Sequence, residues 1–214
     1  MNLPTIKPPA QPIKLYRFSL SGHSHRVELF LSLLGLPVEL IDIDLLAGAQ
    51  KTPEFLEMNP FGQVPVIQDG AVTLADANAI LVYLAGQYGD ERWLPRDPLQ
   101  AAEVQRWLSA AAGMVAFGPA AARAIKLFKA AFNADEVTGR SNRLFGVMDQ
   151  VLQKSPYLVG ATPTLADIAN YSYIAHAPEG GVSLTPYPHL RAWLASIEAW
   201  PGFVPMLKSP ATAS

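Results

Sequence analysis

The chain has 214 residues, a formal net charge of −2 and a composition that is half hydrophobic. This length and composition can build a substantial core and exclude a largely disordered chain. The small net charge, without a block of like charges, argues against a nucleic-acid or anionic-membrane surface. Because the sequence contains no cysteine, disulfides, Cys-ligated metal sites and thiol nucleophiles are excluded, and any sulfur chemistry must come from a bound thiol.

The start of the chain predicts a loose arm. Residues 1–12 carry four prolines and one lysine but no apolar segment typical of a secretory signal, so we expect an N-terminal arm and a cytoplasmic protein. The longest strongly apolar run, residues 27–36, is interrupted by Glu28 and Ser32. It is far shorter than the roughly 20 residues that a membrane span needs, so we expect no crossing of a bilayer.

The next elements predict a parallel β-α-β unit. Residues 13–18 alternate like a short strand, and residues 24–34 have helical apolar spacing before Gly35. Residues 38–45 alternate again, which indicates a second strand reached through a helical crossover and parallel to the first.

A hairpin and a helix complete the first domain. Residues 52–58 predict a short helix and residues 77–88 a longer one. Between them, two strands around Asp69-Gly70 predict a hairpin over residues 64–74. This order is typical of a thioredoxin-like domain, which we assign to residues 13–88.

The remaining chain predicts only helices. Residues 89–96 interrupt the periodicity and form a linker, and residues 97–214 form an all-helical domain. Asp97-Pro98 starts a long Ala-rich helix that we expect to end near Gly118. The later helix signals are a capping-box spacing of Asn133 with Glu136, the same spacing of Thr164 with Asp167, and the apolar spacing of Leu190, Trp193, Leu194 and Ile197 after Pro188.

Two features predict a site made largely from backbone. Pro65 follows the strand-like Val64 and cannot donate to a sheet ladder, so it belongs at a strand start or edge. A cis bond there would present the N–H and C=O of Val64 to another peptide. Eleven residues later, Asp76 opens an apolar helix, where its carboxylate and the free N–H groups of the first turn can meet both charges of an amino acid.

These residues, together with Ser21 in residues 21–27 and the segment 160–167, resemble the glutathione S-transferase family. The resemblance extends from about residue 13 to about residue 203. It implies a thioredoxin-like glutathione-binding domain followed by a helical domain, and a homodimer. It also implies that glutathione is a co-substrate, attacking a small apolar electrophile as a thiolate, without a metal or redox cofactor.

In similar members of that family a serine at the place of Ser21 donates a hydrogen bond to the glutathione sulfur. A thiol with a pKa of about 8.5 needs about 2.7 kcal/mol of preferential stabilisation to lose two pKa units. A hydrogen bond to a charged group supplies about 1.5–3 kcal/mol and a helix N-terminus about 0.3–1 kcal/mol. The alternative is that Ser21 only caps the helix, a role that Ser24 could also take.

The resemblance implies further glutathione contacts. Asp76 would bind the ammonium of the γ-glutamyl group, and the following residue would meet its carboxylate. Here that residue is Ala77, which keeps the N–H but lacks the usual hydroxyl, so about 0.5–1.5 kcal/mol of binding is missing. The other predicted contacts are His23, Gln50, Lys51, Gln63 and Val64.

A pocket for the second substrate is predicted between the domains, with Phe18 and Leu20 from the first loop and Ala110, Met114 and Phe117 from the long helix. Met and aromatic residues at helical spacing are more often core than pocket. His23 and His25 lack a third ligand, so they are weak evidence for a metal, and we expect solvated loop histidines.

Two alternatives to the transferase remain open. The same site could reduce disulfides or peroxides through glutathione, because all the thiols can be glutathione's own. An interaction protein with a decayed site is the other alternative, which Ala77 favours and which Ser21, Val64-Pro65 and Asp76 oppose.

Overall fold

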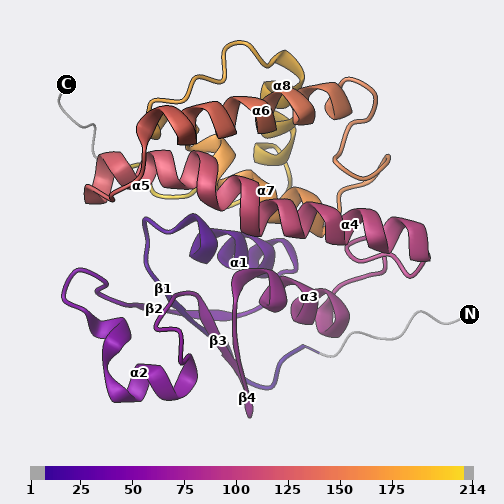
Figure 1. The fold of residues 1–214 in the computed structure, drawn as a ribbon. Helices are drawn as coiled ribbons and strands as arrows, with labels where there is room; N and C mark the ends of the chain where they lie inside the picture. The colour runs from indigo at the N-terminus through magenta and orange to yellow at the C-terminus, as the bar shows by residue number, and fades with distance from the viewer. Residues whose placement is uncertain (1–7, 210–214) are drawn as a thin grey trace, which may run out of the picture.

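The computed structural model of the chain describes residues 8–209. A sheet with α1 and α3 on the side that faces the helical domain forms the N-terminal part, while α2 lies on the other side of the sheet (Figure 1). Every regular element described after α3 is helical, so the expected thioredoxin-like fold followed by a helical domain is confirmed. The first seven positions of the predicted arm, residues 1–12, lie outside the described residues.

The sheet has four strands in the order β2-β1-β3-β4. The strands are β1 (Ile13–Arg17), β2 (Val38–Asp42), β3 (Val66–Asp69) and β4 (Val72–Ala75). β1 and β2 are parallel, whereas β1–β3 and β3–β4 are antiparallel. The parallel pair is joined through α1 (Gly22–Leu33), as predicted from the alternation on either side of a helical segment. Ile13 and Leu15 are fully buried because successive side chains of a strand point to opposite faces.

Capping residues set the helix starts in this half. α1 begins two residues earlier than predicted because Ser21 is its N-cap, with Oγ accepting from the Ser24 N–H at 3.3 Å. The short helix α2 (Pro53–Met58) is capped by Thr52 and follows a 3-10 turn, η1 (Ala49–Lys51). α3 (Ala77–Tyr88) has the predicted bounds.

The helical half contains five α-helices and two irregular segments among the described residues. They are α4 (Pro98–Ala110), the π-helical segment η2 (Ala111–Ala120), α5 (Ala121–Phe128), α6 (Ala134–Leu152), α7 (Leu165–Ala175), the 3-10 turn η3 (Ala177–Gly180) and α8 (Pro188–Glu198). Each of the predicted helix starts is present within two residues.

The predicted end of the long helix near Gly118 coincides with an interruption of helical geometry. Gly118 leaves helical geometry, with φ −116° and ψ −106°, and Pro119 has no N–H to continue the ladder, but the chain resumes as α5. A Cβ at Gly118 would lie 3.1 Å from Ser141 Oγ of α6, so the kink also lets the two helices approach closely. The result is two helical stretches that meet at a kink, and we call the whole of Pro98–Phe128 the bent helix.

The two predicted capping boxes differ. The Thr164–Asp167 box of α7 is complete. At α6, Asn133 accepts from the Glu136 N–H at 3.0 Å. The Glu136 carboxylate pairs with Arg140 at 2.6 Å instead of accepting from the Asn133 N–H. An exposed carboxylate with a cation one turn away has this second option.

The two halves share an apolar core. Leu108 and Ala111 of the bent helix and Ile168 of α7 pack in one cluster with buried residues of α1 and α3. The stretch Pro98–Phe128 is long and apolar enough, by length and composition alone, to cross a membrane. Its buried apolar side chains belong to the two hydrophobic cores of the protein, and we interpret it as a core helix.

Candidate functional site

The loop before β3 is held in shape by a side chain that the sequence reasoning missed. Val64-Pro65 is cis. Asn59, only 3% exposed, donates from Nδ2 to the Gln63 carbonyl at 2.8 Å and accepts at Oδ1 from the Phe61 N–H at 3.1 Å. Val64 itself lies outside every strand. Its backbone is therefore part of a loop that Asn59 holds in shape. The Asn-Pro pair at the loop start was the available signal.

Asp76 caps α3 with an unusual backbone. Its φ is +71°, and its Oδ1 accepts from the Ala79 N–H at 2.9 Å. A left-handed φ at a residue other than glycine costs on the order of 1–3 kcal/mol and is concentrated at functional sites. Asp76 is exposed and Ala77 is buried, so the carboxylate faces solvent at the helix start, where the first-turn N–H groups attract an anion.

These two features meet in one cavity of about 450 Å³, which we call the peptide cavity. It is lined by His23, Asn59, Pro60, Phe61, Gln63, Val64, Pro65, Ala75, Asp76 and Ala77. Five of the predicted glutathione contacts are thus brought together. Gln50 and Lys51 are not in this lining: Gln50 donates to the Leu45 carbonyl at 3.4 Å, and Lys51 is exposed on η1. The backbone of Gln50 does adjoin the loop, because a Cβ at Gly62 would lie 3.0 Å from the Gln50 carbonyl oxygen.

A buried arginine lies behind the peptide cavity. Arg26 of α1 donates from Nη1 to Asn78 Oδ1 of α3 at 2.8 Å, and its Nε and Nη2 have no partner among the described residues. Burial lowers the pKa of Arg26 to about 10, and the nearby charges of Tyr173 and Asp76 act in the opposite direction. The guanidinium therefore stays charged at neutral pH, behind the first turn of α3.

The prediction of solvated loop histidines is wrong, because both lie within α1 and pack against the helical half. His25 is 3% exposed, with Nδ1 2.8 Å from Ser172 Oγ and Nε2 2.9 Å from the Val204 carbonyl. His23 packs edge-on against Tyr173, with ring centroids 5.0 Å apart, and burial followed by the Arg26 charge lowers its pKa to about 3. Within residues 8–209 no group of three or more His, Asp or Glu side chains is placed to hold a metal ion.

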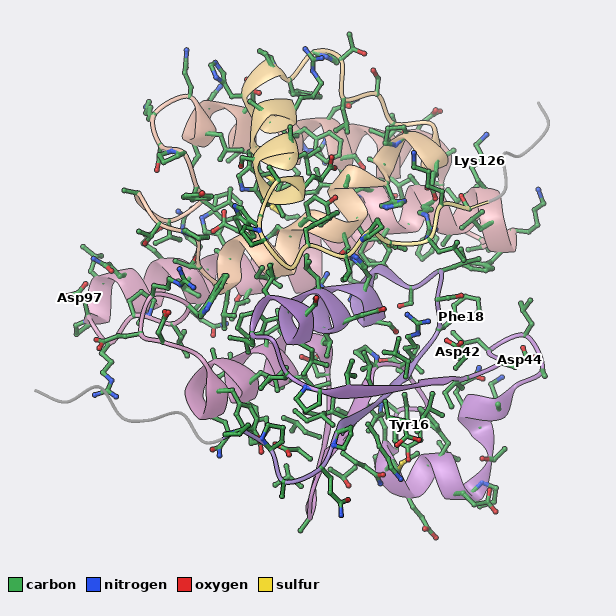
Figure 2. All side chains as sticks on the ribbon, turned by 180° about the vertical axis from the view of Figure 1, so that it is seen from behind. Tyr16, Phe18, Asp42, Asp44, Asp97 and Lys126 are labelled. Carbon is green, nitrogen blue, oxygen red and sulfur yellow. The ribbon has the colours of Figure 1, made fainter. Side chains whose placement is uncertain are left out.

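A second cavity, of about 330 Å³, lies between the two halves, and we call it the apolar cavity. It is lined by Phe18, Leu20, Ser21, Leu45, Leu46, Ala120, Arg123, Ala124, Phe128 and Tyr173. Figure 2 shows Phe18 between the end of α5 marked by Lys126 and the loop marked by Asp44. Apart from Ser21, Arg123 and the Tyr173 hydroxyl, the lining side chains are apolar.

The structure brings Phe18 and Leu20 to the apolar cavity but not Ala110, Met114 and Phe117. The cavity faces the part of the bent helix beyond Gly118, further along the chain than the three predicted positions. Ala110 packs against the core, while Met114 and Phe117 are 40% and 51% exposed. Gly118-Pro119 indicated an interruption of the helix, but the sequence did not show that the chain continues as α5 and contributes Ala120, Arg123 and Ala124 to the lining.

Ser21 lies where the two cavities approach each other. It is on the wall of the apolar cavity, and His23, two residues further on, is on the wall of the peptide cavity. The Ser21 hydroxyl accepts the Ser24 N–H and so keeps its own proton free to donate. Ser24 cannot replace it as the cap, because Ser24 is inside α1 and its Oγ accepts from the Phe18 N–H.

At the neighbouring Gly22, the backbone of α1 lies close to the ring of Tyr173. A Cβ at this position would lie 2.9 Å from the Tyr173 ring of α7. The first turn of α1 can therefore pack directly against the helical half. A thiol placed beside Ser21 would meet a hydroxyl donor and the positive end of a helix together.

Two family models match the chain. The model described as the glutathione S-transferase N-terminal domain matches residues 11–86, and the one for the glutathione S-transferase C-terminal domain matches residues 106–201. Glutathione S-transferase 3 of Zea mays is 35% identical over 208 residues, which is 90% of this chain and 91% of that protein. Glutathione S-transferase F13 of Arabidopsis thaliana is 32% identical over 90% of this chain and 93% of that protein.

Solved structures agree with these matches. A glutathione S-transferase from Pseudomonas fluorescens superposes with a TM-score of 0.85 at 34% identity, covering 92% of this chain and all of that one. A glutathione transferase homologue from Drosophila mojavensis, with glutathione bound, superposes with a TM-score of 0.81 at 27% identity, covering 89% of each chain.

Proposed function

Because the chain belongs to the glutathione S-transferase family and is a glutathione transferase by that membership, we propose that it adds the glutathione thiolate to an apolar electrophile, with Ser21 holding the sulfur. The observation that carries this proposal is the place of Ser21, which caps α1 on the wall of the apolar cavity, beside the peptide cavity. In the reaction a sulfur lone pair forms a C–S bond, and the displaced electron pair moves to the leaving group or acceptor atom of the electrophile.

Glutathione is proposed to lie in the peptide cavity. The backbone of its cysteinyl residue pairs with the main chain of Val64, as an extended peptide pairs with a backbone segment that has no strand partner. Its γ-glutamyl ammonium meets Asp76, and its carboxylate meets the Ala77 N–H at the start of α3, with the buried charge of Arg26 behind. His23 borders the same space from α1.

The glycyl end is proposed to reach Gln63, Gln50 and Lys51. Gln63 lines the cavity, and the Gln50 backbone adjoins the same loop at Gly62. Lys51 is exposed and is the cation among the three, so it would meet the glycyl carboxylate.

The second substrate is proposed to be a small apolar molecule in the apolar cavity. Phe18 and Phe128 lie on its wall with ring centroids 6.2 Å apart, and Leu46 beside them is 80% exposed. An apolar lining with few polar groups favours an apolar ligand. Because Ser21 is part of this lining, such a ligand would lie next to a sulfur bound by Ser21.

We also propose a cytoplasmic homodimer. Support comes from the family and from the outer groove between α3 and α4, where Val82 is exposed beside Gln105. Sedimentation should give a dimer at micromolar concentration, and a monomer would refute it.

Replacing Ser21 tests the proposal. Ser21→Ala loses a hydrogen bond to a charged sulfur, so the pKa of bound glutathione should rise by about 1–2 units and turnover at neutral pH should fall by about 10- to 100-fold. Ser21→Thr keeps the hydroxyl and should keep most of the activity. Ser19→Ala, in the same loop but outside both cavity linings, is the matched control.

Equal turnover by wild type and Ser21→Ala would contradict the role of Ser21. Measuring thiol addition and disulfide reduction on the same samples separates the transferase from a glutathione-dependent reductase. Disulfide reduction that exceeds thiol addition for every electrophile tried would replace the proposed reaction with the reductive one.

A further inference from the structure

The loop that carries Ser21 is held at both ends by different parts of the molecule. Within its own half, the Ser21 N–H donates to the Phe18 carbonyl at 2.8 Å, and the Phe18 N–H donates to Ser24 Oγ at 3.3 Å. The carbonyl of Leu20, the residue before Ser21, accepts from Nη1 of Arg123 at 2.6 Å. Arg123 is on α5, so this bond crosses from the helical half to the Ser21 loop.

Arg123 is itself fixed by a buried polar cluster. Its side chain is 2% exposed, and its Nε lies 2.6 Å from Oε2 of Glu179 on η3. Glu179 also accepts from Ser209 Oγ at 2.5 Å and contacts His176 Nδ1 at 2.6 Å. Burial alone would raise the pKa of Glu179, but the hydrogen bonds from Ser209, Arg123 and His176 outweigh it and lower the pKa to about 2. The carboxylate stays ionised and holds the guanidinium.

The backbone around this cluster leaves little room for movement. A Cβ at Gly180 would lie 2.6 Å from the backbone nitrogen of Arg123. η3 is therefore pressed directly onto the start of α5, and both partners of the ion pair are attached to segments in contact. The donors of the planar guanidinium have a fixed geometry. Because Glu179 binds Nε, the direction in which Nη1 points toward the Leu20 carbonyl is also fixed.

We propose that Arg123 is a positioning residue for Ser21. By holding the Leu20 carbonyl, it fixes the Ser21 loop against the helical half, so that the Ser21 hydroxyl stays at the edge of the apolar cavity. This inference rests on the proposed function for the role of Ser21 in the reaction, whereas the bracing of the loop does not depend on it. Arg123 acts through Leu20 and not by contact with the sulfur.

Arg123→Lys is the variant for the test, because it keeps the charge beside Glu179 and loses the fork. Arg140→Lys is the matched control. Arg140 has the same arrangement of an acid and a carbonyl, with Nη2 2.6 Å from Glu136 and Nη1 3.3 Å from the Phe117 carbonyl, but it does not touch the Ser21 loop.

The first measurement is hydrogen exchange of the Ser21 amide without glutathione. Arg123→Lys should speed this exchange by about tenfold or more through local opening, while amides of β1 stay protected and Arg140→Lys has no effect.

The second measurement is the steady-state kinetics of glutathione addition by the same variants. A displaced Ser21 should lower kcat by on the order of 10- to 100-fold and raise the pKa of bound glutathione, with KM for glutathione changed less than about threefold.

The outcomes distinguish failure of the Arg123 proposal from failure of the proposed function. Unchanged Ser21 exchange and unchanged kcat in folded Arg123→Lys would overturn the proposal. If the wild type binds no glutathione, the proposed function fails, and the exchange result still decides whether Arg123 braces the loop. If Arg123→Lys does not fold, Glu179→Gln takes its place. It keeps the size of the side chain and removes the charge that holds Arg123, and the proposal is overturned if Ser21 exchange stays at the wild-type rate.

Discussion

Lowering the pH from 7 to 5 should destabilise the fold through His25. This side chain is buried between α7 and the chain end, with both ring nitrogens engaged by Ser172 Oγ and the Val204 carbonyl. A neutral ring that donates from Nε2 and accepts at Nδ1 satisfies both contacts. Burial, the largest cause, lowers its pKa from 6.5 to about 4, although the hydrogen bond to Val204 acts in the other direction.

The direction and magnitude of this change in the free energy of unfolding follow from proton linkage. The pKa of His25 is lower in the folded than in the unfolded chain, so its contribution is complete above about pH 6.5 and is lost as the pH falls toward 4. Each pH unit between these limits costs about 1.4 kcal/mol, which gives a loss of about 2 kcal/mol at pH 5. The lowered pKa of Glu179 acts only below about pH 4.5, outside this window.

The assay is urea unfolding at pH 7 and pH 5 for the wild type, His25→Gln and the surface control His189→Gln. His25→Gln should be less stable at pH 7, and the stability difference from the wild type should shrink by about 2 kcal/mol at pH 5. His189→Gln should follow the wild type. A stability difference between wild type and His25→Gln that is the same at both pH values would show that His25 does not cause the loss of stability.

Three further changes test other parts of the molecule. Gly180→Ala should lower the free energy of unfolding by about 2 kcal/mol or more in urea titrations, because its Cβ would meet the Arg123 backbone; an unchanged midpoint would show that η3 can move. Ala77→Ser should tighten glutathione binding by about 2- to 10-fold in calorimetry by adding a hydroxyl at the α3 start, and weaker binding would count against the placement of the γ-glutamyl carboxylate. Asn59→Ala should weaken glutathione binding by loosening the Val64 loop, whereas full affinity would mean that the loop holds its shape without that side chain.

The sequence predicted best what local signals determine. α3 has the predicted bounds because Asp76 caps its start and Gly89 follows its last residue. The hairpin around Asp69-Gly70 likewise depends on neighbouring residues. The Val64-Pro65 and Asp76 features come together in the peptide cavity because a hairpin and a turn of known length place them side by side.

What the sequence did not predict depends on distant contacts. The burial of His25 depends on Ser172 and Val204, which are 147 and 179 residues away along the chain. The apolar cavity lies beyond a kink that requires α6 to pack at Gly118. Arg123 gives no local signal, because its partners, Leu20 and Glu179, come from two distant segments of the fold. A single sequence contains no measure of such distances.

The most direct test of the central proposal is calorimetric titration with glutathione in buffers of different ionisation enthalpy. We expect saturable binding with release of a proton near neutral pH, because the site favours the thiolate, and loss of most of that release in Ser21→Ala. Binding without proton release would contradict the role of Ser21. No binding would contradict the assignment of the peptide cavity to glutathione.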